Sequence, residues 1–325
     1  MLSVALGCGA CAGTPSPPTT DLPAVFEANR IFVEPILTSG DTLRFLTDTG
    51  GIGFLSTDVA DKLSLTRTAA RVIPDSISIE TARLPDFTRR ASIPSIPVRN
   101  DPFTRALQGR IRVLDYNPWG ERKDEMVGDG MLGQEWFADR VWLIDYVAKR
   151  FAIMTPAAGS TVSADHVARL GFPVDSTGRR VWHWPSIEAE IDGEVIPFLF
   201  DTGATVVCDS TTLDIIADGA PATRAASFLA GTLFDHLAQT NPGWRLIGEA
   251  ERGGIGAMLE VPTVTIAGHS VGPVWFTRRT DSAFHRYMSQ RMDRQVEGAL
   301  GGSLFRYFRL IIDYPNAVAV FDKPS

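Results

Sequence analysis

The chain has 325 residues, which is enough for two compact units that each bury a core. Its 44% hydrophobic and 21% charged residues are typical of an ordinary globular protein. A net charge of −7 without any Lys/Arg-rich run argues against a nucleic-acid binder, and no uninterrupted apolar stretch approaches the length of a membrane span.

The N-terminal segment 1–22 differs in kind from the rest. Its start is small and apolar, and a Pro/Ser/Thr-rich stretch follows at 14–20. The approach to Cys8 through Ala5-Leu6-Gly7 resembles a bacterial lipoprotein signal followed by a tether, although no basic residue precedes it. The alternative is an unstructured N-terminus with incidental thiols. We expect export with lipid anchoring at Cys8, so that the protein lies in the periplasm or on the membrane of a bacterium.

The body of the chain begins with two β-prone runs, 31–37 and 43–47, separated by a turn around Gly40. The second run ends at the tripeptide Asp48-Thr49-Gly50. A β-prone run that stops at a carboxylate and a Gly predicts a strand entering a tight turn, which would lift Asp48 clear of the sheet. Ser56 then predicts the N-cap of a short helix over 57–63.

Further along, Gly130-Met131-Leu132-Gly133 precedes a turn of helix that includes Phe137, and then Ile144-Asp145-Tyr146. A strand is predicted over 151–154. The small, polar stretch near 155–163 suits a linker. The sequence therefore predicts one lobe over 23–158 and another over 159–325.

The second half repeats this order of strand, turn, tripeptide, N-cap, glycine motif, phenylalanine and Ile-Asp-Tyr. The counterparts are 187–191, Asp192-Gly193-Glu194, Asp201-Thr202-Gly203 after 195–200, Asp209 before 210–216, Gly298-Ala299-Leu300-Gly301, Phe305 and Ile312-Asp313-Tyr314. One Asp-Thr-Gly is an ordinary turn, but two in matching contexts indicate an internal duplication.

The remaining segments complete a mostly β fold with a few short helices. Strands are predicted over 261–267, 274–276, 310–313 and 317–321, and a helical stretch near 222–239. The segment 245–259 predicts a hairpin with a mobile tip at Gly253 and Gly254, and 76–93 is its weaker counterpart in the first half.

The paired tripeptides resemble the aspartic peptidases, and among these the bacterial retropepsin-like branch, with two copies fused in one chain. The resemblance covers nearly all of the chain after about residue 28. Asp201-Thr202-Gly203-Ala204-Thr205 is close to the typical active-site loop. Met131-Leu132-Gly133 and Ala299-Leu300-Gly301 match the residues that support such loops. The resemblance implies a bilobal, mainly β, acid-protease-like fold with pseudo-twofold symmetry.

The resemblance also implies an aspartic-type endopeptidase, a hydrolase in which Asp48 and Asp201 share one water. One carboxylate takes a proton from that water, and the neutral partner donates to the developing oxyanion. The substrate would be an extended peptide or protein, closed over by the hairpin at Gly253 and Gly254. We expect a monomer without cofactor or metal. The residues that the resemblance assigns to supporting the loops are Thr49, Gly50, Thr202, Gly203, Leu132, Gly133, Leu300 and Gly301.

One departure from the family pattern follows Gly50, where the chain reads Gly51-Ile52-Gly53. Such loops normally carry a small residue and then Ser, Thr or Asp. Two extra glycines predict a looser loop on the Asp48 side, and misplacement by about 1 Å can lower a rate on the order of a hundredfold. The alternative function is therefore a catalytically weak or inactive bilobal module that binds peptide.

Other enzyme classes have weaker support. The five His residues show no metal-ligand spacing, and no G-x-S-x-G occurs. Paired carboxylates also serve glycoside hydrolases, where their separation sets the stereochemistry, but nothing in the Asp-Thr-Gly context favours sugar chemistry. Cys208 is expected to be a small core residue, Asp145 and Asp313 to cap turns or face solvent, and Trp182-His183-Trp184 to pack in the core or between lobes.

Overall fold

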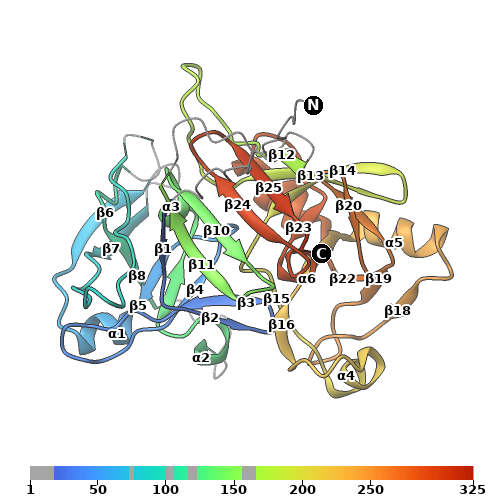
Figure 1. Ribbon diagram of the computed structural model, residues 1–325, viewed down its shortest axis with the longest axis horizontal. Coiled ribbons are helices and arrows are strands. Elements are labelled where there is room, and N and C mark those ends of the chain that lie inside the picture. The colour runs from blue at the N-terminus through green and yellow to red at the C-terminus, as the bar shows by residue number, and fades with distance from the viewer. Residues whose placement is uncertain are drawn as a thin grey trace, which may run out of the picture.

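The computed structural model describes residues 18–72, 77–99, 101, 105–115, 123–155 and 166–324 (Figure 1). Cys8 and most of the predicted linker lie outside these residues, so lipid anchoring stays a prediction. Within the described part of the chain, strands far outnumber helices, and the helices are short. The expected mainly β fold with a few short helices is confirmed.

The first half builds an eight-stranded sheet in which the glycine-motif strand β9 lies between β4 and β5. It runs parallel to β4 and antiparallel to β5, so it crosses beneath the loop that joins them. The sheet contains, in spatial order, β2 (Ala24–Glu27), β3 (Arg30–Val33), β4 (Phe45–Thr47), β9 (Gly130–Leu132), β5 (Phe54–Ser56), β8 (Ile111–Leu114), β7 (Ile77–Ala82) and β6 (Thr68–Val72). The helices here are α1 (Thr57–Lys62), α2 (Lys123–Met126) and α3 (Gln134–Phe137).

The second half builds a nine-stranded sheet with β23 between β14 and β17. β23 is parallel to β14 and antiparallel to β17. The spatial order is β18 (Arg245–Ile247), β19 (Met258–Val261), β22 (Val274–Arg279), β17 (Ser227–Ala230), β23 (Gly298–Leu300), β14 (Glu194–Phe200), β13 (Ser186–Ile191), β20 (Val264–Ile266) and β21 (His269–Val271). The helices are α4 (Ser210–Ile216), α5 (Gly231–Thr240), the π-helix η3 (Ser282–Met288), the 3-10 turn η4 (Ser289–Arg291) and α6 (Gly302–Phe305).

A third, six-stranded sheet joins strands from both halves, seen in Figure 1 as blue, green, red and yellow-green strands side by side. Its centre is the antiparallel pair β10 (Val141–Asp145) and β24 (Arg309–Asp313), with Val141 opposite Asp313 and Asp145 opposite Arg309. The complete order is β1 (Thr19–Asp21), β11 (Arg150–Met154), β10, β24, β25 (Val318–Asp322) and β12 (Val167–Arg169). Because these strands come from distant parts of the chain, the sheet ties the two halves together.

Two secondary-structure predictions in the second half were wrong. Helix covers only α5, because residues 223–230 pair as β16 (Thr223–Ala225) and β17. The predicted strand over 261–267 is two strands separated by Pro262 and Thr263, because β19 and β20 pair with different partners. In both places, long-range strand pairing overrides the local pattern.

The short helix α4 is also not the counterpart of α1. Asp209 caps α4 as expected, accepting from Thr212 N at 2.7 Å. However, the strand that pairs antiparallel with β23 is β17, which leads into α5, just as β5 pairs with β9 and leads into α1. The pair of β15 (Thr205–Val207) and β16 with α4 between them is therefore an extra segment of the second half.

Candidate active site

The structure brings the carboxyls of Asp48 and Asp201, which are 153 residues apart, within hydrogen-bond reach of each other. Each Asp follows the last residue of a strand, β4 or β14, and enters a tight turn. A Cβ added to Gly50 would lie 2.5 Å from Asp201 Cγ, and one added to Gly203 would overlap Asp48 Cγ. Each glycine thus leaves room for the carboxyl of the opposite loop, which is the physical reason that a side chain does not fit there.

Two buried threonines link the loops reciprocally. Thr49 Oγ1 donates to Phe200 O at 2.6 Å and accepts from Thr202 N at 3.0 Å. Thr202 Oγ1 donates to Thr47 O at 3.1 Å and accepts from Thr49 N at 3.1 Å. Both side chains are fully buried, so these four bonds are shielded from competing water.

Replacing Thr202 with Val is expected to destabilise the protein without changing its shape. The hydroxyl has two buried backbone partners, and leaving each unpaired costs about 1–3 kcal/mol. Urea unfolding measures this loss. The matched control is Thr205→Val, because among the described residues Thr205 Oγ1 bonds only within its own loop, to Gly203 O, and Thr205 is half-buried. Equal stability of the two variants would show that the hydroxyl does not bridge the loops.

The carboxyls of the dyad sit in a poorly solvated place. Burial, and secondly the charge of Asp201, raise the pKa of Asp48 well above its ordinary value. Burial also raises the pKa of Asp201. The amides of Gly50 and Gly203 donate to Asp48 Oδ1 and Asp201 Oδ1 at 2.8 and 3.0 Å, which favours an ionised form. The pair therefore holds one proton to higher pH than an isolated Asp does, and it titrates as a unit.

The two glycine motifs support the loops from below. Leu132 O accepts from Asp48 N at 2.9 Å, and Leu300 O accepts from Asp201 N at 2.8 Å. A Cβ on Gly133 would collide with the Ile52 backbone, and one on Gly301 with the Ala226 carbonyl. These positions need glycine because two backbones pass in contact there.

The segment Gly51–Gly53, predicted to be loose, is held at both ends. Gly53 N donates to Glu135 Oε1 at 3.0 Å, and Gly53 O accepts from Arg112 Nη1 at 3.2 Å. Arg112 and Glu135 also form an ion pair, and they are only 3% and 1% exposed. A buried pair of charges therefore sits directly behind the loop of Asp48.

Gly51 is anchored as well. Its carbonyl accepts from Gln134 N at 2.9 Å and from Trp184 Nε1 at 3.3 Å. Sequence reasoning missed Arg112 and Glu135, although the charge of Glu135 within the buried helix α3 was a signal that it needed a partner.

Two apolar groups lie next to the Asp48 loop, one through Met131 and the other through Ile52 and Trp184. A Cβ on Gly51 would approach the Met131 methyl group at 2.8 Å and overlap Asp48, which places Met131 beside the first carboxyl. The first group consists of Phe32, Leu46, Phe54, Met126, Val127, Met131 and Val207, with Leu114 and Ala222 against it. The second group includes Leu199, Ala299, Trp184, Phe284, Met288, Met292 and Val296, with Ile52, Trp182 and Phe228 against it.

The glycine tip predicted to close over the substrate belongs to the β18–β19 hairpin. Gly253 and Gly254 have φ of +100° and +70°, a conformation that side chains disfavour. The tip is tied down beside them, since Arg252 N donates to Val207 O at 2.8 Å and Glu251 pairs with Arg279 at 2.5 Å. The tip thus contacts β15, whose Val207 packs in the first apolar group; closure over the dyad stays a prediction. The counterpart predicted over 76–93 was wrong: β7 pairs with β6 and β8, and no strand follows it over 83–93. The tip of the β6–β7 hairpin lies outside the described residues.

Other predicted residues have structural roles. Cys208 is a buried free thiol in the core, and burial raises its pKa. Asp145 Oδ1 accepts from the amides of Val147 and Ala148, and Asp313 Oδ1 accepts from Asn316 N, so both carboxylates cap turns.

No family model matches this chain, and a search of curated proteins found no relative. Across the described ranges, no helix combines the length and apolar character needed to cross a membrane. The same residues contain no group of three or more His, Cys, Asp or Glu side chains arranged to hold a metal ion.

Proposed function

We propose that the protein is an aspartic-type endopeptidase that hydrolyses a peptide bond with a water held by Asp48 and Asp201. The observation that carries this proposal is the contact of the two carboxyls between loops cross-linked by Thr49 and Thr202. The two carboxyls lie within hydrogen-bond reach of each other, whereas those of glycoside hydrolases are separated by about 5 Å or more, so the geometry does not favour sugar chemistry.

The chemistry follows from one proton shared by the dyad. The ionised carboxylate takes a proton from water, whose oxygen bonds to the carbonyl carbon, while the neutral carboxyl protonates the carbonyl oxygen. The newly ionised carboxylate then takes a proton from one hydroxyl of the tetrahedral intermediate. The other carboxyl, which took the proton of the water, protonates the amide nitrogen as the C–N bond breaks. The dyad thereby returns to its starting state.

We also propose that the two halves are related lobes of an acid-protease-like fold. Support comes from strand pairing: β9 lies between β4 and β5 with the same directions that β23 has between β14 and β17. Asp48 N and Asp201 N also bond to equivalent leucine carbonyls of the two glycine motifs. The substrate is proposed to be an extended peptide whose apolar side chains contact the half-buried members of the two apolar groups, such as Ile52, Trp182 and Leu114.

A peptide-binding module without turnover is the second candidate. The observation that favours it is that Val207, from the extra segment of the second half, belongs to the same buried apolar group as Phe54 and Met131. A segment of the chain itself thus covers part of the surface next to Asp48.

Cleavage of a broad peptide library from acid to neutral pH tests the two candidates. Activity is expected to be highest where the pair holds one proton, and to fall as pH rises through the pKa at which that proton leaves. Because burial raises the pKa of Asp48, this fall is expected above the range of an ordinary Asp. Binding of library peptides without cleavage at any pH would contradict the peptidase and favour the binding module.

A further inference from the structure

A small cavity, whose lining includes neither Asp of the dyad, lies where the β2–β3 turn of the first half meets α4, β16 and α6 of the second. Its volume is about 160 Å³. A cavity of about 150 Å³ holds a benzene molecule, so this one accommodates a ligand of about six non-hydrogen atoms.

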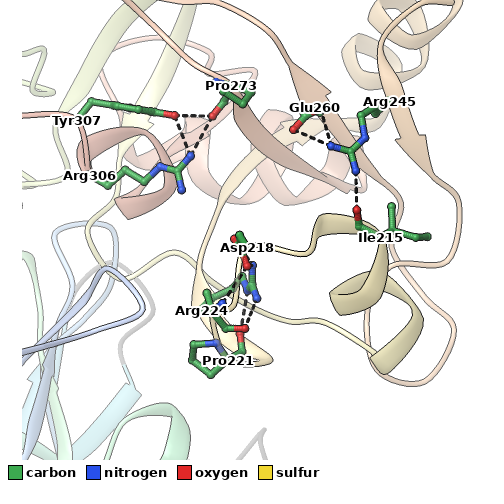
Figure 2. A network of polar contacts seen from close by, with 10 residues as sticks. Ile215, Asp218, Pro221, Arg224, Arg245, Glu260, Pro273, Arg306 and Tyr307 are labelled. Atoms are coloured by element: carbon green, nitrogen blue, oxygen red, sulfur yellow. Dashed lines mark hydrogen bonds and ion pairs between the residues drawn. The ribbon is translucent and has the colours of Figure 1, made fainter.

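The wall of the cavity contains two guanidinium groups with different surroundings (Figure 2). Arg224 has a counter-charge: its Nη1 contacts both oxygens of Asp218 at 3.0 and 2.9 Å, and its other nitrogens donate to the carbonyls of Pro221 and Ala220. Its charge is thus balanced.

Arg306, in contrast, has only neutral hydrogen-bond acceptors among the described residues. Its Nη2 donates to Pro273 O at 3.2 Å and to Tyr307 Oη at 2.8 Å, both neutral acceptors. Among the described residues no carboxylate forms an ion pair with Arg306, and its buried Nε has no hydrogen-bond partner there. In Figure 2, the contacts of Arg306 form a network separate from those of Arg224 and Arg245. The formal charge of the cavity lining is +1, from Arg224, Arg306 and Asp218.

The rest of the lining is largely apolar. Ile216, Met258 and Trp275 line the cavity, and the Arg245 guanidinium lies over the Trp275 ring, 5.3 Å from its centroid. A half-buried guanidinium without a counter-charge beside apolar walls suits an anion that has a short hydrocarbon body. We propose that this cavity binds a small organic carboxylate, with its carboxylate on Arg306 and its hydrocarbon part against Met258 and Trp275.

This proposal is independent of the dyad and of peptide cleavage. Calorimetric titration with butyrate, acetate and inorganic phosphate tests it. We expect saturable binding of butyrate to the wild-type protein, with weaker binding of acetate because it fills less of the cavity. Arg306→Gln is expected to weaken butyrate binding at least about tenfold, because it removes the charge-assisted contact. The matched control, Arg169→Gln, removes one exposed positive charge on β12 and is expected to bind butyrate like wild type.

A second variant keeps the test decisive if Arg306→Gln does not fold. Ala220→Leu enlarges a half-buried residue of the cavity wall while retaining Arg306, and it is expected to reduce butyrate binding by filling the cavity. Absence of saturable binding to wild type would overturn the proposal. So would equal butyrate binding by Ala220→Leu and wild type, or tighter binding of phosphate than of butyrate.

Discussion

Replacing either Asp48 or Asp201 with Asn is expected to lower peptide cleavage by at least about a thousandfold, and the double variant is expected to lose little more. Residues that act as a unit have non-additive effects, because each single change already removes the proton-sharing pair. The measurement is kcat on a peptide that the wild-type protein cleaves. The control is Asp145→Asn, which alters a turn cap far along the chain and is expected to leave kcat unchanged.

The same single variants are expected to keep or gain stability near neutral pH. A carboxyl whose pKa is raised in the folded state contributes stability that is complete below its unfolded pKa and is lost as pH rises through its folded pKa. Burial raises the pKa of both Asp48 and Asp201, so at neutral pH the pair opposes folding. Urea unfolding at acid and neutral pH measures this. Lost activity accompanied by unfolding would contradict a catalytic role, and variants that cleave as fast as wild type would end the peptidase proposal.

Breaking the ion pair behind the Asp48 loop is expected to have the second largest effect. Removing one member of a buried pair leaves an uncompensated charge and costs about 3–5 kcal/mol, which is the loss expected for Glu135→Ala. Removing an exposed pair such as Arg278 and Asp235, which are 39% and 59% exposed, is expected to cost less than about 1 kcal/mol. Arg278→Met is therefore the matched control.

A double change separates the positioning role of this pair from its effect on stability. Arg112→Met combined with Glu135→Leu removes both charges and is expected to recover most of the lost stability. The double variant still leaves the amide and carbonyl of Gly53 without their partners. Its kcat is therefore expected to be lower than that of wild type, and its Gly53 amide is expected to exchange faster with solvent. Wild-type kcat and unchanged exchange in the double variant would show that the pair does not position the loop.

The sequence by itself determined the local elements that carry the candidate site. A β-prone run that ends at Asp and Gly specifies a strand and a turn from neighbouring residues alone, and both tripeptides occur in that setting. The repeated order of motifs also singled out Asp48 and Asp201 among the 38 acidic residues. Asp209 as the cap of a helix, and Asp145 and Asp313 at the ends of strands, were similarly local features.

Only the tertiary structure decided which distant groups meet. The glycine content of Gly51–Gly53 predicted a loose loop. In the structure, however, Arg112 and Glu135, which lie 59 and 82 residues from Gly53, hold this loop through hydrogen bonds. Residues 223–230 read as helix from local pattern, yet β17 gains its hydrogen bonds from β22 and β23, whose positions no local pattern contains. Local propensity is weak beside strand pairing and burial, so the sequence located the two carboxylates and tertiary contacts decided how each is held.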